Sequence, residues 1–221
     1  MNNLTLLVIL SILSCKGLPA LVKQQDTWKI VYEQDFEKIE EGGLPEDFFL
    51  LEGDFSVRTI NGQKLLSMQG NPVGEHGFLF GPRLGSETIQ LSFSCLGGSK
   101  SRRHNVFSGA MGGIRGINYR VNPISSNVTV SFMGSKVVSP IYWSSKNWIN
   151  IKITVIPKVA DVESLIIIRS SSKSQDNFYS EEIKMSLNGM IKGGKCALWG
   201  FSYAEKEMYW DDLLIRVQTS D

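Results

Sequence analysis

The chain has 221 residues, of which 42% are hydrophobic and 20% are charged. A chain of this length and composition can bury a hydrophobic core, which excludes a disordered protein and predicts one globular domain, or at most two. Lysine and arginine number 23, and aspartate and glutamate number 22, so the formal net charge is +1. Because this balance gives no overall field to attract a phosphate backbone, we expect no nucleic acid partner.

The N-terminal segment has the pattern of an export signal. Residues 4–13 form an apolar run that is shorter than the roughly 20 residues of a membrane-spanning helix. The sequence ILSC at residues 12–15 resembles the lipobox of bacterial lipoproteins, whose cysteine becomes lipid-modified and N-terminal after cleavage. The resemblance implies a signal peptide at residues 1–14, a lipid on Cys15, a tether over residues 15–26 and a protein exported and anchored to a bacterial membrane. An ordinary secreted protein is the first alternative, and an uncleaved membrane anchor is the second.

From residue 27 onward, polar and apolar residues alternate with a period of two, which is typical of half-buried strands. The clearest cases are residues 88–95, 127–132 and 149–155. Further strands are expected at residues 28–33, 48–51, 55–60, 64–68, 77–80, 117–121, 136–143, 165–170, 196–203 and 208–217, and a short helical turn at 180–187. Many short strands without strand-helix alternation predict an all-β domain over residues 27–221, built as a two-sheet antiparallel β-sandwich.

Short motifs at both ends of this domain resemble those of one fold family. The sequences GKCALWGF at residues 194–201 and MYWDDLLIRV at 208–217 resemble the two closing strands of concanavalin A-like jelly rolls. Asp-Phe-Glu at residues 35–37, followed by LEGDFSV at 51–57, resembles their opening segment. The resemblance implies the concanavalin A-like jelly roll. Lectins, laminin-G modules, carbohydrate-binding modules and glucanases share this fold, so it leaves the activity open.

The acidic residues of the end strands are a candidate metal site. The resemblance implies that Asp35 and Glu37 lie close to Asp211 and Asp212, because the first and last strands of such sandwiches are commonly neighbours. Carboxylate oxygens brought together in this way are ligands that calcium prefers. The sequence therefore suggests a structural calcium ion as the one cofactor. The alternative is that these acids cap strand ends and pair with lysine or arginine.

The same opening segment contains a candidate catalytic motif. Glu33, Asp35 and Glu37 are two residues apart, so a strand would project all three side chains from one face. The spacing resembles the Glu-x-Asp-x-Glu core of laminarinase-type glucanases, in which paired carboxylates hydrolyse glycosidic bonds with retention. Gln34 stands where that motif has an aliphatic residue, and the segment is the first strand rather than a central one. We therefore expect a protein that is not an enzyme.

Planar hydrogen-bond donors in two segments are candidate contacts for a sugar. Arg103 and His104 belong to the basic cluster at residues 100–105, which is either a solvated loop tip or a contact for an acidic polymer. Asn118 and Arg120 would share one strand face. That face binds a ligand if it is the concave one, and it is merely solvated if it is not.

Tryptophans are the second kind of candidate contact, because sugar rings stack their C–H faces on flat indoles. The chain has five. We expect Trp143 and Trp210 to contact a ligand, and Trp28, Trp148 and Trp199 to fill the core.

Taken together, these features favour non-catalytic binding of a glycan or another cell-envelope polymer. A glycoside hydrolase or lyase-like enzyme of the same fold is the first alternative. A structural or adhesive surface lipoprotein with a protein partner is the second. Cys95 and Cys196 both fall in predicted strands, where they form either a cross-strand disulfide or two buried thiols.

Overall fold

The computed structural model describes the chain from residue 27 to residue 219, with gaps. The described ranges are residues 27–70, 74–97, 106–111, 117–122, 127–140, 148–158, 161–171, 179–190, 193–202 and 207–219. Within these ranges no helix is long and apolar enough to span a membrane. The proposed signal peptide and tether, with Cys15, lie outside the described residues.

The described residues form fifteen strands. Most coincide with the segments in which polar and apolar residues alternate. The strands are β1 (Thr27–Gln34), β2 (Phe49–Glu52), β3 (Phe55–Ile60), β4 (Gln63–Met68), β5 (His76–Leu84), β6 (Ile89–Gly97), β7 (Val106–Met111), β8 (Ile117–Asn122), β9 (Asn127–Phe132), β10 (Ser135–Pro140), β11 (Trp148–Pro157), β12 (Asp161–Ser171), β13 (Tyr179–Asn188), β14 (Gly194–Phe201) and β15 (Met208–Thr219).

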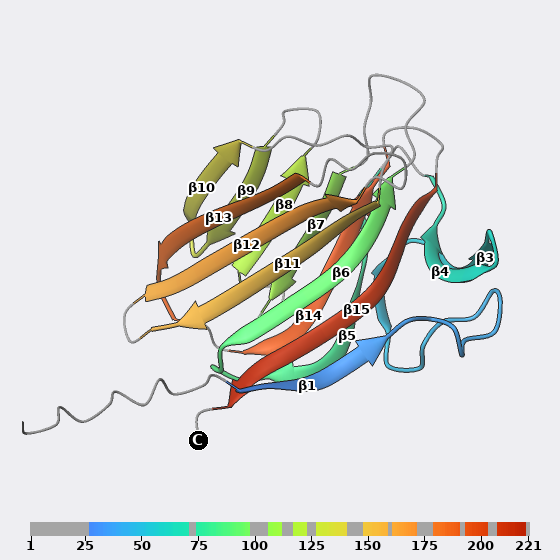
Figure 1. The fold of residues 1–221 in the computed structure, drawn as a ribbon, viewed down its shortest axis with the longest axis horizontal. Coiled ribbons are helices and arrows are strands. Elements are labelled where there is room, and N and C mark those ends of the chain that lie inside the picture. Colours follow the sequence, from blue (N-terminus) through green and yellow to red (C-terminus); the bar gives the residue numbers. More distant parts are fainter. Residues whose placement is uncertain are drawn as a thin grey trace, which may run out of the picture.

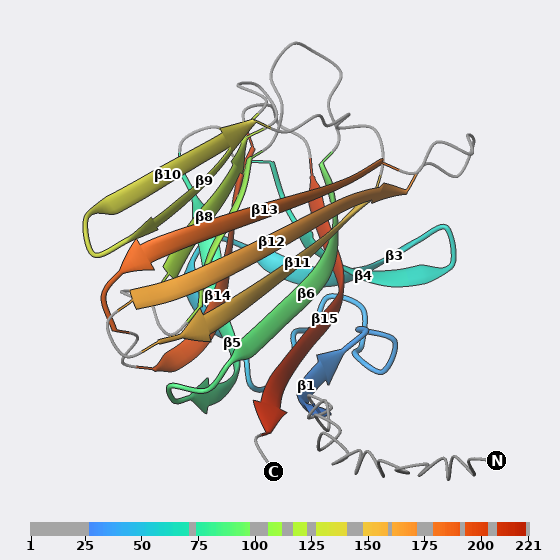
Figure 2. The ribbon, with the colours of Figure 1, turned by 60° about the vertical axis from the view of Figure 1, so that its left-hand side comes forward.

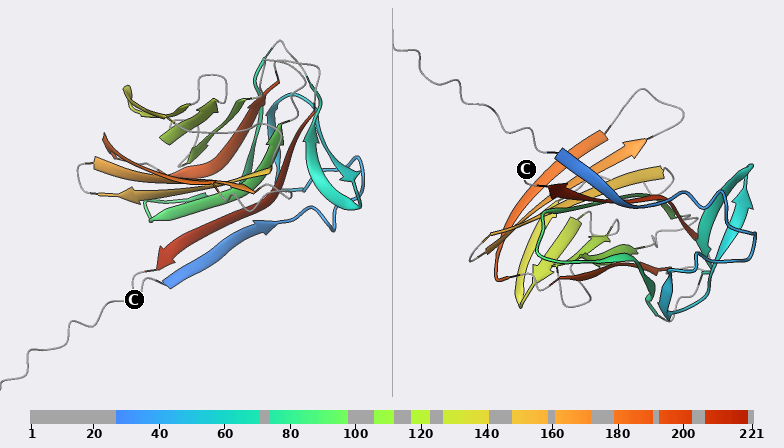
Figure 3. Two further views of the ribbon diagram at one scale, coloured as in Figure 1. Left: turned by 45° about the horizontal axis from the view of Figure 1, so that its top comes forward. Right: turned by 90° about the horizontal axis from the view of Figure 1, so that it is seen from below.

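Two antiparallel sheets pack face to face, as the sequence predicts (Figures 1 and 2). One sheet has the order β13-β12-β11-β6-β15-β4-β3, with β1 also paired to β15. The other has seven strands in the order β10-β9-β8-β7-β14-β5-β2. Strands β1 and β15 run side by side, which brings the two ends of the described chain together (Figure 3). The all-β sandwich is therefore confirmed.

The core lies between the sheets and takes large side chains from both. Phe78 and Phe80 of β5 come from the seven-stranded sheet, and Phe93 and Trp210 come from the other; all four are fully buried. The rings of Phe78 and Trp210 meet edge to face with centroids 6.4 Å apart, and Phe55 packs against both. Edge-to-face aromatic contacts of this kind connect the two layers.

A β-bulge in β15 changes which side chains face the core. Asp211 lies opposite Ser94 and Leu214 lies opposite Ser92, so three steps along β15 match two along β6. Asp212 adopts a left-handed backbone with φ of 52°. The extra residue reverses the alternation, since Trp210 before the bulge and Leu213 after it are both buried. Asp211, which lies at the bulge, is only 5% exposed.

Two expectations about local structure are wrong. Residues 180–187 belong to β13, which pairs along its length with β12, rather than to a helical turn. Trp28 and Trp148 are half-buried rather than fully in the core. Of the two alternatives for Cys95 and Cys196, the structure has the buried, free thiols. Burial raises the pKa of Cys196 to about 12 and that of Cys95 well above its usual range. Neither thiol is reactive near neutral pH.

Candidate functional site

The acidic triplet of the opening segment does not form a catalytic pair. Strand β1 ends at Gln34, so Asp35 and Glu37 follow the strand instead of sharing a face of it with Glu33. Phe36 breaks the alternation, because it adopts φ of 60° and its ring is fully buried. The prediction that the three carboxylates project from one strand face is therefore wrong.

The side chains in this turn are engaged in local hydrogen bonds. The side-chain oxygen of Gln34 accepts a hydrogen bond from the backbone N–H of Phe36 at 2.7 Å, and Asp35 accepts one from the N–H of Glu37 at 3.2 Å. Glu37 accepts one from the N–H of Lys64, also at 3.2 Å. These contacts match the alternative in which the acids stabilise the end of a strand.

The four candidate calcium ligands come close together but are not arranged as metal ligands. Burial is the main cause that raises the pKa of Asp211, and the charges of Asp212, Glu37 and Asp35 add to it. Both carboxyl oxygens of Asp211 already accept hydrogen bonds, one from the N–H of Asp212 at 2.8 Å and one from Gln63 at 3.5 Å. Among the described residues, no group of three or more His, Cys, Asp or Glu side chains could hold a metal ion. The geometry does not fit the calcium ion suggested by the sequence.

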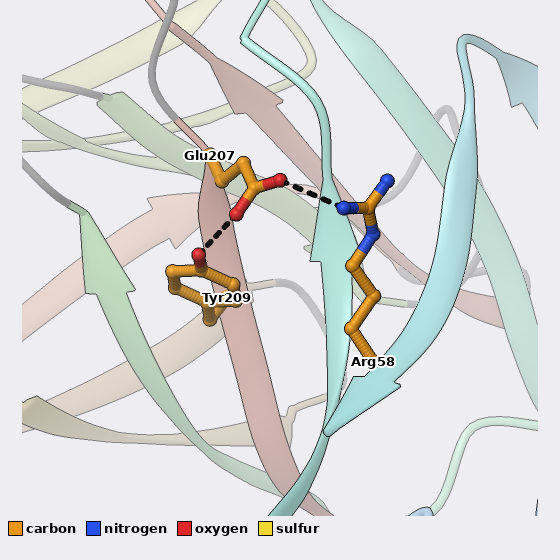
Figure 4. A network of polar contacts seen from close by, with 3 residues as sticks. All are labelled: Arg58, Glu207 and Tyr209. Carbon is orange, nitrogen blue, oxygen red and sulfur yellow. Dashed lines mark hydrogen bonds and ion pairs between the residues drawn. The ribbon is translucent and has the colours of Figure 1, made fainter. Parts of the chain in front are cut away.

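A polar network joins the β3–β4 hairpin to β15 (Figure 4). Arg58 lies 3.2 Å from one carboxyl oxygen of Glu207, and the hydroxyl of Tyr209 donates to the other. Burial, followed by the hydrogen bond to Glu207, raises the pKa of Tyr209 to about 12. The tyrosine therefore stays protonated near neutral pH, and the network holds two strands together rather than supplying an acid or a base.

The seven-stranded sheet has an outer face, opposite the core, on which one register row crosses six strands. The row consists of Val138, Thr129, Arg120, Ser108, Trp199 and Gly77. On β9 and β14, the residues next to the row, Val130 and Leu198, are buried in the core, so Thr129 and Trp199 project outward. Residues paired directly across antiparallel strands share a face, which places Arg120 on the same side.

Trp199 lies directly on the backbone of β5. A Cβ atom at Gly77 would be 2.0 Å from Cδ1 and 2.3 Å from Nε1 of the indole, so only glycine permits this contact. Trp199 is half-buried and not in the core as expected. The ring packs against the sheet and keeps part of its surface in solvent.

An ion pair accompanies this indole on the outer face. Arg120 of β8 pairs with Glu75, which immediately precedes β5, so the pair reaches over the two intervening strands β7 and β14. Both side chains are 38% exposed. Exposed ion pairs of this kind contribute only about 0–1 kcal/mol, so a ligand can compete for the two groups at low cost. We call Glu75, Gly77, Arg120 and Trp199 the outer-face site.

The predicted ligand contacts divide into three groups. Arg103, His104 and Trp143 lie outside the described residues. Asn118 lies on β8, opposite Ala110 and Ser131, two register rows from Arg120. Trp210 was expected to contact a ligand, and this is wrong, because the alternation of β15 turns it into the core and leaves none of it exposed.

Three members of the outer-face site were not predicted as contacts. The sequence predicts Trp199 in the core, because an alternating strand does not indicate which of its faces is buried. No local sequence pattern marks Glu75 or Gly77 as a ligand contact. Their role depends on β5 lying beside β14, a pairing that joins residues more than one hundred positions apart.

Comparison with solved structures places the fold among the lectins. Lectin UEA-II complexed with galactose superposes with a TM-score of 0.58 and 13% identity, covering 86% of this chain and 99% of that one. Lectin II from Ulex europaeus gives 0.56 and 14%, with the same coverage of both chains. The exoplasmic/lumenal domain of VIP36 in its Ca2+/Man2-bound form gives 0.52 and 7%, covering 82% and 87%.

These similarities define the class of fold, which is the lectin-type β-sandwich. Because the sequence identities are so low, they show the fold alone. No family model matches the chain, and no curated protein matches it in sequence.

Proposed function

We propose that this protein binds glycans without catalysis, through the outer-face site. The observation that carries the proposal is the half-buried indole of Trp199. This side chain of β14 packs on the backbone of β5 and keeps part of its surface accessible to solvent. Flat aromatic surfaces of this kind accept the C–H faces of sugar rings. Structures of similar fold are described as bound to galactose or to Man2, which supports a sugar as the ligand class.

The polar groups beside the indole suit sugar hydroxyls. The guanidinium of Arg120 presents several N–H donors in a plane, and the carboxylate of Glu75 accepts hydrogen bonds. A hydroxyl can therefore receive a hydrogen bond from one group and donate to the other. Stacking on Trp199 would supply most of the contact area, and the pair would select the orientation of the ring.

Replacing Trp199 by alanine tests this proposal directly. We expect W199A to weaken glycan binding about tenfold or more, because it removes the stacking surface. A glycan array should first identify a ligand for the domain from residue 27 onward, and calorimetry should then give the dissociation constants. Trp28→Ala is the matched control, since Trp28 is also half-buried but lies on β1 of the other sheet. Equal affinity of W199A and the wild type for the ligand would contradict the proposal.

We also propose that the mature protein is attached to a bacterial membrane by a lipid on Cys15. The lipobox-like sequence at residues 12–15 supports the proposal. Mass spectrometry of the full chain produced in a bacterium is expected to show Cys15 as a lipid-modified N-terminal residue, and Cys15→Ser to remain uncleaved or unlipidated. An uncleaved wild-type chain with a free Cys15 thiol would contradict it.

A further inference from the structure

Phe49 is an aromatic side chain on the outer face that the proposed function leaves unused. It lies on β2, the strand at the edge of the seven-stranded sheet, opposite Leu79 of β5. The next residue, Leu50, lies opposite Phe78, whose ring is in the core, so Phe49 projects away from the core. Its side chain is 63% exposed. This exposure leaves the apolar ring available for a contact whose burial would be favourable.

The separation of Phe49 from Trp199 exceeds the width of one sugar ring. Trp199 lies on β14 and Phe49 on β2, two strands away, and Phe49 belongs to the register row of Ala197. With strands about 4.8 Å apart and residues about 3.4 Å apart along a strand, the two aromatic positions are about 12 Å apart. A ligand that contacts both must have several linked units.

The side chains between the two aromatic positions are uncharged, and two of the three are small. Gly77 and Ala197 have little or no side chain, and the half-buried Leu79 lies beside Phe49. A bulky or charged side chain at position 77 or 197 would hold a chain of sugars away from the sheet. Gly77 is covered by the indole of Trp199 and Ala197 is buried, so the half-buried Leu79 is the apolar side chain that lies between the two aromatic positions on β5.

Among the residues that the structure describes, the charges around this path disfavour an acidic ligand. Arg120 is already paired with Glu75, so its charge is largely balanced. Glu52, which is exposed, lies opposite Gly77 on β2 and adds a negative charge beside the path. A carboxylate or sulfate group on the ligand would be repelled by these two glutamates.

We infer that the outer face takes an extended, neutral oligosaccharide of three or more sugar units, which runs across the strands and stacks on both Trp199 and Phe49. This inference rests on the proposed function and narrows its ligand class. It assigns Phe49 as the residue that distinguishes a long chain from a short one, while Trp199 binds a sugar ring in either case.

A chain-length series with matched variants tests the inference. The probes are neutral gluco-, manno- and galacto-oligosaccharides from one to six units, and one oligouronate series, measured by calorimetry. The wild type is expected to gain about tenfold in affinity between two and four units, because a second aromatic contact forms. Phe49→Ala should lose this gain and bind short probes as the wild type does. Ile30→Ala, an exposed apolar residue of β1, should behave as the wild type.

The possible failures are distinguishable. If the wild type binds short probes but gains nothing with length, or if Phe49→Ala keeps the gain, the inference fails and the proposed function stands. If the oligouronates bind as tightly as the neutral series, the neutral ligand class is wrong. If the wild type binds no probe in any series, the proposed function itself fails. Size-exclusion chromatography is a further check: a wild-type dimer that Phe49→Ala converts to a monomer would show that the phenylalanine is exposed for self-association, and would overturn the inference.

Discussion

Replacing Trp210 by alanine is expected to lower the free energy of unfolding by about 3–5 kcal/mol, the usual cost of removing a large buried aromatic side chain. The indole is fully buried between the sheets and packs against Phe55 and Phe78. Gly200 lies directly beneath it, since a Cβ atom there would be 2.7 Å from the ring. The structure around the indole is thus shaped to hold it, and little can collapse into the space that it leaves.

Denaturation with urea, followed by circular dichroism, measures this loss. Trp28→Ala is the control, because Trp28 is half-buried on β1 and should cost much less. Trp210→Phe keeps an aromatic ring in the core and remains measurable if the alanine variant fails to fold. We expect glycan binding by folded Trp210→Phe to match the wild type. If a folded Trp210 variant has the stability of the wild type but does not bind the glycan, Trp210 is a ligand contact and not a core residue.

The alternation of residues was enough to predict the class of fold. Segments such as 88–95 and 149–155 have one apolar face each, and they became β6 and β11, paired with each other in the centre of the larger sheet. The expected helical turn at 180–187 failed for a definable reason. Exposed Glu182, Lys184 and Ser186 do alternate along β13, but an edge strand with many polar residues lacks the strong apolar face that marks a central strand.

The candidate site was less predictable, because it depends on pairing between distant strands. The donors of Arg120 make it a candidate from the sequence, and the structure places it on the outer face in the register row of Trp199, with β7 between them. Its partner Glu75 lies 45 positions away, and no local pattern indicates the contact. The bulge at Asp212 is another example, because it reverses the alternation of β15 and so determines which side of that strand is buried. Such irregularities follow from the packing of the whole sandwich.

The carboxyl of Asp211 is the buried acid most relevant to stability. Burial is the main cause that raises its pKa to about 7, and the charges of Asp212, Glu37 and Asp35 add to the effect. The hydrogen bond from the N–H of Asp212 acts in the opposite direction and is outweighed. The folded protein therefore holds a proton on this carboxyl under mildly acidic conditions, whereas the unfolded chain releases it at about pH 4.

The sign of the pH dependence follows from this difference. Between about pH 4 and about pH 7 the folded state binds more protons at Asp211 than the unfolded state does, so the free energy of unfolding falls as the pH rises. The stabilisation that Asp211 contributes to the folded state is fully present below about pH 4 and is lost by about pH 8. Each unit of difference in pKa corresponds to about 1.4 kcal/mol, so the loss is on the order of 2–4 kcal/mol.

Asp211→Asn should remove this loss, because an amide does not ionise while its oxygen can still accept the hydrogen bond from the N–H of Asp212. At about pH 8 the variant should be more stable than the wild type by about 2 kcal/mol, and at about pH 4 the two should be nearly equal. Urea denaturation across this range gives the free energy of unfolding of both proteins as a function of pH. Glu46→Gln is the control, because it removes an exposed carboxylate elsewhere and should follow the wild type. Parallel curves for the wild type and Asp211→Asn would mean that Asp211 is already ionised when folded.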